Sequence, residues 1–591
     1  MNDALQLLVA DYLELMKESG ELDDFMPLLV SGMGHQVVHT AQKGVRENGV
    51  DMASVGKDDS GRRTLFMWVL KCGTIGRAEW NSGPQSIFQS LQDLAHTYVR
   101  ANVAPEHSKL PRMAVVVTNG EFLSSIQGQM AGAYENYASQ YGIKVVNVNG
   151  SKLAAWTVEH LLDDHILPIE RRSLFRRMLA NVGQPDLCIS VGRQLVNGLV
   201  SDLPASGGSA ASRKKRTLQA LRGIRAALSA LTLRAAEEDN LLAPYRLSEY
   251  AVLATWSKVH ADLLNPASAY AVEFGQILGD AMSIAMRYHS RLDAFYRTEN
   301  GFAYVLPHNL FLSKRVFEEA GRLGLQGCFW AWHASTTGSD AGGHWAYSAR
   351  LVDLLSTHSN LQFPAFDHQA TDIHLAMLLL VITGRNEVAT GWMHSLCERI
   401  GVARTKRDFW PTVRTLDEQL QVRFGLQNPS DASTASSTLI PILLTWTAAL
   451  GLDGAYQFLR EVVMPECSWS TPNFWSSDAG YDEVVADPRA LHSHGIGEAL
   501  AFVPAKPKEF LERMAKPLPG VESIEASGWY RARFPFIPML AALQWERQIP
   551  RQMLVQQAVA FCESGAALNN SPEAPAAASE TEAPAHVEDH D

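Results

Sequence analysis

The chain has 591 residues, of which 46% are hydrophobic and 19% are charged, as is ordinary for a globular protein. This length exceeds one hydrophobic core, so we expect two to four domains. The formal net charge of −12, from 51 basic and 63 acidic side chains, excludes a surface that binds nucleic acid indiscriminately. Any contact with phosphates must therefore come from a local basic patch.

Cysteine spacing and hydropathy indicate the compartment. The six cysteines lie far apart and form no CxxC pair, which argues against disulfides or a thiolate zinc site and suits a reducing cytosol. The N-terminus lacks the basic region and cleavage site of a signal peptide. No apolar run reaches the roughly 18–20 residues of a membrane span. We expect a cytoplasmic protein; membrane association through the apolar segments 375–383 and 438–452 is the least favoured alternative.

The first 80 residues predict two helices and three strands. Apolar residues recur at helical spacing over 4–18, and a shorter helix is expected near 24–31. A strand is expected at 36–38. A hairpin follows, with one strand carrying Asp51, a tight turn over 58–61 and a returning strand that ends at Lys71. The hairpin thus brings an acid and a lysine onto neighbouring strands.

Strands and helices then alternate up to residue 168. We expect a helix over 85–100, a strand over 112–118, a helix over 121–141, a strand over 143–148 and a helix over 151–162. The run RMAVVVT at 112–118 is almost wholly apolar, which is typical of a central strand covered on both faces. Residues 1–168 are therefore predicted to form an α/β domain, with a mixed sheet flanked by helices.

Residues 169–216 are predicted as a basic helical connector with a linker at 203–212. The linker is rich in small and polar residues. Two groups of basic residues flank it and are the best candidates for nucleic-acid phosphate contacts: Arg171, Arg172, Arg176 and Arg177, then Arg213, Lys214, Lys215 and Arg216, with Arg222 and Arg225 further on. Two ordinary solvated helix faces are the alternative interpretation.

From residue 217 to 563 strand patterns almost vanish and helices dominate. Paired helical segments, such as 375–383 with 387–400, suggest helical hairpins and a repeat-like arrangement, although no strict period is found. We interpret this region as an α-helical sensor or partner-binding domain. The tail at 564–591 is expected to be disordered, since residues 571–591 contain six acids and no Lys or Arg.

The hairpin residues carry a family resemblance. The segments Glu47-Asn48-Gly49-Val50-Asp51 and Val69-Leu70-Lys71-Cys72-Gly73 are followed by strands at 115–119 and 145–150. In this order and spacing, residues 20–165 resemble the PD-(D/E)xK restriction-endonuclease-like superfamily, as found in bacterial restriction and anti-phage effectors. The resemblance implies a restriction-endonuclease-like fold and hydrolysis of DNA phosphodiester bonds.

The resemblance also implies roles for individual residues. Asp51 would be a metal ligand, Lys71 would position the attacking water, and the carbonyl of Leu70 would be a backbone ligand. Glu47, four residues before Asp51, could be a further ligand or a supporting acid. The cofactor would be Mg²⁺ or Mn²⁺, because these hard cations prefer oxygen ligands, acidify a bound water and offset charge on the phosphate.

Val69 departs from the family pattern. Active relatives carry Glu, Asp or Gln two residues before the lysine, and valine cannot bind a metal through its side chain. Three interpretations remain: the acid has moved to Glu47, Glu14 or Glu18; the site is a weak, conditionally assembled nuclease; or catalysis is lost.

We therefore carry two hypotheses. The first is a metal-dependent DNA nuclease of anti-phage defence, controlled by the helical domain. The second is a catalytically inactive scaffold that binds nucleic acid or a partner effector. The expected partners are DNA and a protein, or a second copy of the chain, bound through the helical domain.

Two groups that contain histidine have the residue types of a metal site. His35 and His39 lie about 13 Å apart if they sit on one strand, which is too far for a shared ion. The residues Asp367, His368, Asp372 and His374 form a tighter cluster. Capping and surface solvation are the interpretation favoured for this cluster.

Overall fold

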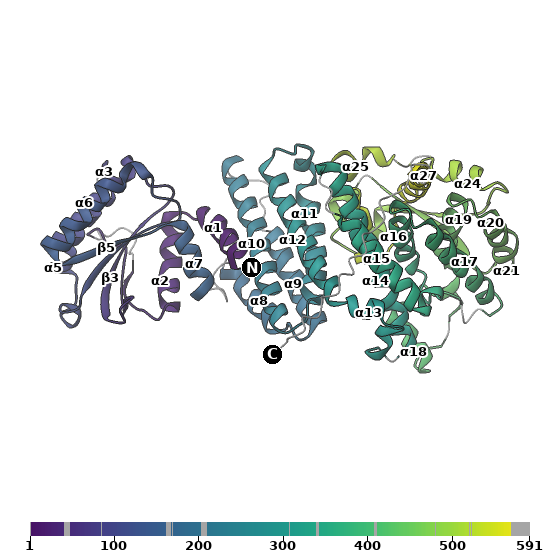
Figure 1. Cartoon of the computed structure of the whole chain (residues 1–591), viewed down its shortest axis with the longest axis horizontal. Coiled ribbons are helices and arrows are strands. Elements are labelled where there is room, and N and C mark those ends of the chain that lie inside the picture. The colour runs from purple at the N-terminus through teal and green to yellow at the C-terminus, as the bar shows by residue number, and fades with distance from the viewer. Residues whose placement is uncertain are drawn as a thin grey trace, which may run out of the picture. The chain divides into compact units, whose positions relative to one another are not determined.

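The computed structural model describes residues 2–40, 48–83, 86–160, 167, 169–201, 210–306, 308–338, 342–406, 410–428, 430–478, 480–518, 521 and 523–568. The chain divides into two compact units (Figure 1). The first unit contains Met1–Arg291 together with Asp482–Asp487, and the second contains Leu292–Tyr481 and Pro488–Asp591.

The first unit begins with a five-stranded sheet domain. Its elements are α1 (Asn2–Glu14), η1 (Glu18–Leu22), α2 (Asp23–Gly32), β1 (Gln36–Thr40), β2 (Met52–Lys57), β3 (Arg63–Lys71), α3 (Arg77–Asn81), α4 (Ile87–Asp93), η2 (Leu94–Tyr98), α5 (Val99–Ala101), η3 (Pro105–His107), β4 (Arg112–Thr118), α6 (Ser124–Tyr141), β5 (Ile143–Val148) and α7 (Gly150–His160). The strand order is β1-β2-β3-β4-β5; β1, β2 and β3 pair antiparallel, whereas β4 and β5 join in parallel. The mixed sheet predicted from the sequence is confirmed.

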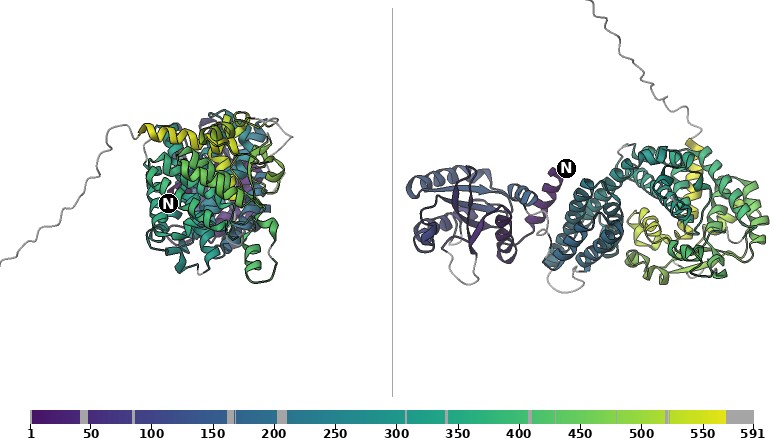
Figure 2. Two further views of the ribbon diagram at one scale, coloured as in Figure 1. Left: turned by 90° about the vertical axis from the view of Figure 1, so that its right-hand side faces the viewer. Right: turned by 90° about the horizontal axis from the view of Figure 1, so that it is seen from below.

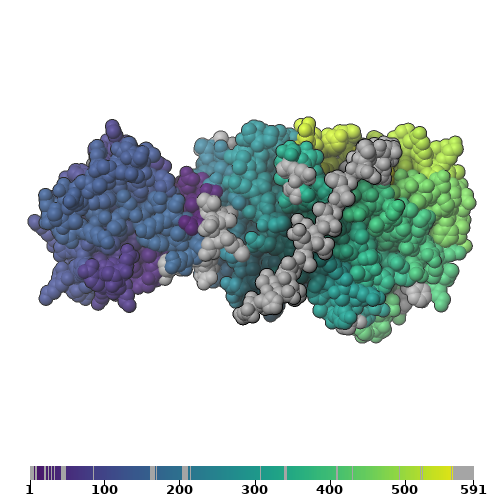
Figure 3. All heavy atoms as spheres, in the orientation of Figure 1, coloured from purple at the N-terminus to yellow at the C-terminus, as the bar shows by residue number. Residues whose placement is uncertain are grey.

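Helices cover both faces of this sheet, as Figure 1 shows for α2 and α7 on one side and α6 on the other. Alternating side chains of β3 supply the two cores. Phe66, Trp68 and Leu70 belong to the cluster that also contains residues of α1, α2 and α7. Met67 and Val69 belong to the opposite cluster, with residues of α4, η2 and α6. In the space-filling view the domain is a closely packed purple-to-blue body (Figure 3).

Two predicted helices are interrupted. The helix expected over 4–18 ends at Glu14, and a π-helical turn, η1, starts at Glu18. The helix expected over 85–100 contains a second π-helical turn, η2, between α4 and α5. Such turns insert an extra residue into the helical repeat and shift which side chains share a face.

Helices make up the rest of the first unit. They are α8 (Ile169–Ala180), α9 (Pro185–Ser201), α10 (Ala210–Glu237), α11 (Leu242–Val259), η4 (His260–Leu264) and α12 (Ala269–Arg291). Residues 202–209, most of the predicted linker, lie outside the described residues, and α10 already begins at Ala210. Helix α10 packs on α1, where an Arg222 Nη1 donates to the Asp11 carbonyl over 2.7 Å.

The second unit is mainly helical, as the green-to-yellow ribbons of Figure 2 show. Its helical elements are α13 (Asp293–Arg297), η5 (Gly301–Tyr304), α14 (Asn309–Thr337), α15 (Gly343–Thr357), η6 (Ser359–Gln362), α16 (Gln369–Ile382), α17 (Asn386–Ala403), α18 (Leu416–Arg423), η8 (Asp431–Thr434), α19 (Leu439–Ala449), α20 (Asp453–Phe458), η9 (Leu459–Val463), α21 (Met464–Glu466), α23 (Ala490–Ser493), α24 (Pro507–Met514), η10 (Ile524–Ala526), α25 (Gly528–Arg531), α26 (Phe536–Gln544) and α27 (Arg551–Leu568). Helix α22 (Tyr481–Val484) begins in the second unit at Tyr481 and continues into the segment Asp482–Asp487 of the first. Helix α14 packs along both α15 and α16.

The second unit also contains a small sheet that the sequence reading did not predict. Strands β6 (Ser436–Ser437), β7 (Thr471–Ser477) and β8 (Gly495–Ala499) pair in that order. At the C-terminus α27 continues to Leu568, so residues 564–568 of the predicted tail are helical, and residues 569–591 lie outside the described residues. Within the described ranges no helix is both long and apolar enough to cross a membrane.

Candidate functional site

The acid and the lysine of the hairpin lie at the same end of the sheet. Asp51 stands directly before β2, its N–H donates to the Trp68 carbonyl over 2.9 Å, and its Oδ2 accepts the Leu70 N–H over 2.6 Å. The regular pairing of the two strands ends at Met52 and Trp68, and Asp51 lies one residue before it. Val69 packs into the cluster on one face of the sheet. Lys71, the last residue of β3, reaches Glu18 of η1, whose Leu22 packs into the cluster on the other face.

A second carboxylate reaches this site from η1. Lys71 Nζ lies 2.7 Å from Glu18 Oε1, and Glu18 Oε2 accepts the Cys72 N–H over 3.4 Å. The Lys71 side chain is only 17% exposed, whereas Glu18 is 43% exposed. An ammonium with this little solvent needs a nearby anion, and Glu18 provides it.

Asn119, which follows β4, holds the two segments in place. Its Nδ2 donates to the carbonyls of Leu13 (2.8 Å) and Met16 (3.2 Å), while its Oδ1 accepts the Gly73 N–H over 2.7 Å. Asn119 is 3% exposed. It therefore ties the chain just before Glu18 to the loop just after Lys71. This role was not predicted from the sequence, although an amide directly after an almost wholly apolar strand was the available signal.

Cys72 is not poised as a nucleophile. Burial, together with the negative charge of Glu18, raises the pKa of its thiol to about 11, and its Sγ donates to the Met16 carbonyl over 3.2 Å. A thiol in this state is protonated at neutral pH and unreactive. Lys215 of α10 opposes the rise in the Cys72 pKa electrostatically, so that basic residue lies within electrostatic reach of the site.

Val69 occupies the place of the missing acid and is fully packed. It is 1% exposed and belongs to the apolar cluster that includes Trp80, Ile87 and Leu91. Its side chain offers no donor to a metal or to water. The departure seen in the sequence is thus also a structural one, because hydrocarbon fills this position.

The described residues do not fit a Mg²⁺ or Mn²⁺ centre. In the described part of the chain, no group of three or more His, Cys, Asp or Glu side chains is placed to hold an ion. The Asp51 carboxylate already accepts the Leu70 N–H. The Glu18 carboxylate already accepts Lys71 Nζ and the Cys72 N–H. Glu47, a predicted ligand and catalytic residue, lies outside the described residues. The metal assignment therefore remains a prediction.

Comparison with protein-family models, with curated proteins and with solved structures finds no match. The function of this chain is therefore inferred from its own geometry.

The first predicted basic group divides into structural and exposed residues. Arg171 donates to the Gly198 carbonyl over 3.2 Å, and Arg172 donates to the Leu167 carbonyl over 3.0 Å. Arg176 and Arg177 are exposed on α8. Arg176 and Arg177 are therefore the more exposed pair of this group.

The second basic group lies in the first turns of α10. Lys214 and Arg216 are exposed and Lys215 is half-buried, while the side chain of Arg213 lies outside the described part. Further along α10, Arg222 pairs with Glu273 over 2.5 Å and Arg225 pairs with Asp280 over 2.7 Å, both on α12. Arg222 and Arg225 hold helices together and are removed from the phosphate-contact set.

The second unit's acid and histidine cluster is structural. Asp367 accepts hydrogen bonds from Ser437 and Thr438 at the start of α19. His374 is fully buried between Trp446 and Gln557, and burial lowers its pKa to about 4. These contacts give Asp367 a capping role, as predicted, whereas the predicted surface solvation is wrong, because Asp367, Asp372 and His374 are all buried.

Proposed function

We propose that the N-terminal domain is restriction-endonuclease-like in fold and binds nucleic acid without cleaving it. The observation that carries this proposal is Val69, which lies on β3 two residues before Lys71 and is packed in an apolar cluster at 1% exposure. A phosphodiesterase of this kind needs more than one carboxylate around its metal, and here position 69 supplies none.

The topology supports the fold assignment. Three antiparallel strands are followed by a helix and a parallel strand, and the acid and the lysine lie at one end of the two central strands. This order matches the one that the sequence resemblance implies. Fold alone does not carry the activity, which depends on the side chains at the site.

Exposed cations support nucleic acid as the ligand. Arg176, Arg177, Lys214 and Arg216 are exposed on α8 and α10, two helices that pack against each other. Each phosphate neutralised by such a cation adds about 0.9 to the slope of log affinity against log salt concentration for duplex DNA. The proposal therefore predicts salt-dependent binding.

Binding is tested by fluorescence anisotropy with a labelled duplex between 50 and 300 mM NaCl. We expect Lys214→Glu with Arg216→Glu to weaken binding at least tenfold and to lower the salt slope by about 2. The matched control is Lys506→Glu with Lys508→Glu, which reverses two exposed charges of the second unit. Equal effects of both double variants would contradict a local binding surface.

A metal-dependent DNA nuclease of anti-phage defence is the second candidate, favoured by the contact of Glu18 with Lys71. In this case Glu18 replaces the acid absent at Val69, and Glu47 adds a further carboxylate. The test is cleavage of supercoiled plasmid with Mg²⁺ or Mn²⁺ by the unaltered chain, Asp51→Ala and Lys71→Ala. Cleavage by the unaltered chain that both variants lose would overturn the proposal of binding without cleavage. Cleavage that both variants retain would show that Asp51 and Lys71 are not the catalytic residues.

A further inference from the structure

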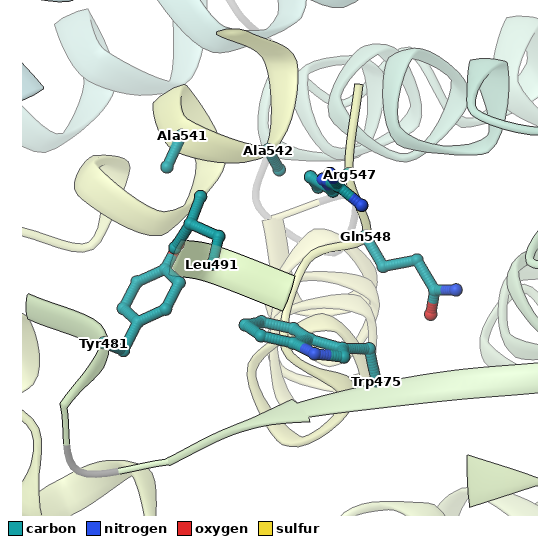
Figure 4. Close-up of a pocket in the computed structure, with 7 residues that line it drawn as sticks. All are labelled: Trp475, Tyr481, Leu491, Ala541, Ala542, Arg547 and Gln548. Atoms are coloured by element: carbon teal, nitrogen blue, oxygen red, sulfur yellow. The ribbon is translucent and has the colours of Figure 1, made fainter. Parts of the chain in front are cut away.

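The second unit contains a cavity of about 210 Å³ between its small sheet and α26. Its lining residues come from β7, from α22 and α23, and from α26 with the turn that follows it: Trp475, Tyr481, Leu491, Ala541, Ala542, Arg547 and Gln548. Figure 4 shows the two alanines across the space from Trp475, with Arg547 and Gln548 beside them.

Two aromatic rings form one wall. The rings of Trp475 and Tyr481 lie 5.7 Å apart at 54°, and Tyr481 is 3% exposed. Gly495 of β8 makes room for the indole, because a Cβ at this position would lie 2.1 Å from Trp475 Nε1. The half-buried Trp475 thus has a fixed position with its ring at the cavity.

The turn after α26 directs a cation to the same space. The Arg547 N–H donates to the Ala542 carbonyl over 2.8 Å, which closes the end of the helix. This turn requires Glu546 to adopt φ +52°, a left-handed conformation usually given to glycine. A non-glycine residue held in this region points to a built feature rather than a chance turn.

Arg547 and the acid before it both have neighbours: Arg547 Nη2 donates to the Pro488 carbonyl over 3.4 Å, and the charge of Glu546 partly offsets the effect of burial on the Arg547 pKa. Glu546 binds Lys314 of α14, and its other oxygen lies 3.7 Å from His368. Arg547 is the only cationic side chain among the seven lining residues, and none of the seven is acidic. Burial lowers the pKa of Arg547, so a bound anion would stabilise its charge.

We propose that this cavity binds a small aromatic anion, one ring system that carries a phosphate or a carboxylate. The ring stacks on Trp475, and the anionic group pairs with the guanidinium of Arg547. Gln548 offers an amide to the ring edge. A cavity of about 210 Å³ suits one small molecule rather than a peptide or a nucleic-acid strand. This site is independent of the one in the N-terminal domain.

The test is isothermal titration calorimetry of the full chain with adenosine monophosphate and indole-3-acetate. Adenosine and inorganic phosphate are the probes that lack either the charge or the ring. We expect saturable binding of at least one ring-bearing anion, with adenosine and phosphate at least tenfold weaker. Tighter binding of the monophosphate assigns a phosphate ligand, and tighter binding of indole-3-acetate assigns a carboxylate.

Three variants link the binding to the cavity. Arg547→Gln removes the cation, Trp475→Ala removes the stacking surface, and Ala542→Leu fills the space from a helical position that accepts leucine. We expect each to weaken binding at least tenfold. The matched control, Arg531→Gln, removes an exposed arginine outside the cavity and should bind as the unaltered chain does.

The absence of saturable binding for every probe would overturn the proposal. Unchanged affinity in both Arg547→Gln and Ala542→Leu would also overturn it. Thermal melting of each variant shows whether the second unit still folds. If Arg547→Gln fails to fold, the affinity of Ala542→Leu decides the outcome.

Discussion

Replacing Val69 with glutamate tests whether this position is the place of an absent acid. In the structure, position 69 lies on β3 two residues before Lys71, near the end of the strand that follows Asp51. A carboxylate introduced by Val69→Glu would therefore join Asp51 and create the paired acids that the resemblance requires. The same change puts a charge into an apolar cluster at a position that is 1% exposed.

The cost of the buried charge and the gain from metal binding can each be expressed as a free energy. If burial raises the pKa of the new carboxyl by about 2 to 3 units, the variant loses about 3–4 kcal/mol of stability at neutral pH. For a domain of this size that corresponds to a fall of about 6–16 °C in the melting temperature. A divalent ion at 100 times its dissociation constant returns about 2.7 kcal/mol, or about 5–11 °C.

The assay is differential scanning calorimetry of Val69→Glu with Mn²⁺, with Mg²⁺ and with a chelator. We expect the melting temperature of the variant to rise with metal, whereas Val69→Gln loses stability without a metal response. Adding Asp51→Asn to Val69→Glu should abolish the response. A folded Val69→Glu chain that melts identically with metal and with chelator would refute the paired-acid geometry.

The remaining predictions concern single contacts. Glu18→Gln should lower unfolding stability by at most about 1 kcal/mol in denaturant titration, and less in 1 M NaCl, because its pairing with Lys71 is partly exposed. Gly49→Ala should cost several kcal/mol or prevent folding, since φ is +80° and a Cβ would lie 2.0 Å from the Ser90 carbonyl oxygen; Gly142→Ala, with φ +62° and nothing within 4 Å, is the control and should cost about 1 kcal/mol. Burial lowers the pKa of His374 from 6.5 to about 4, so the side chain is neutral in the folded state. Its contribution to stability is complete above pH 6.5 and falls by up to about 3 kcal/mol as the pH drops toward 4. The melting temperature of His374→Gln should therefore depend less on pH between 6.5 and 4.

The strands of the N-terminal domain were predictable because their signal is local. The runs at Arg112–Thr118 and Ile143–Val148 have the predicted bounds, since each is a short apolar segment between polar turns. The hairpin turn was predictable for the same reason: Gly61 has φ +77°, and Asp58 accepts the backbone N–H groups of Ser60 and Arg62.

The contacts that decide function were harder to predict, because they are long-range. Glu18 and Lys71 are 53 residues apart, and their meeting depends on the end of α1 at Glu14 and on the π-helical turn after it. Periodicity alone continued that helix to residue 18 and left Glu18 as one of several possible substitutes. Similarly, Arg222 was grouped with phosphate contacts because its acidic partner lies on another helix, 51 residues away.

The small sheet of the second unit was missed for a different reason. The segment TPNFWSS of β7 contains Pro, Asn and Ser, which are poor strand formers. Its strand conformation comes from pairing with β8, about 20 residues later. The cavity beside Trp475 follows from that pairing, so neither could be predicted from local pattern.

The short segment Asp482–Asp487 affects where the chain can be truncated for expression. This segment belongs to the first unit although the residues on either side belong to the second, and Asp482 accepts the indole N–H of Trp256 over 2.9 Å. Trp256 is fully buried in α11. Cutting the gene after codon 291 would therefore remove an acceptor from the interior of the piece that is kept. Because α11 packs on α9, α10 and α12, expression of the N-terminal half should keep these helices and supply a peptide that covers 482–487.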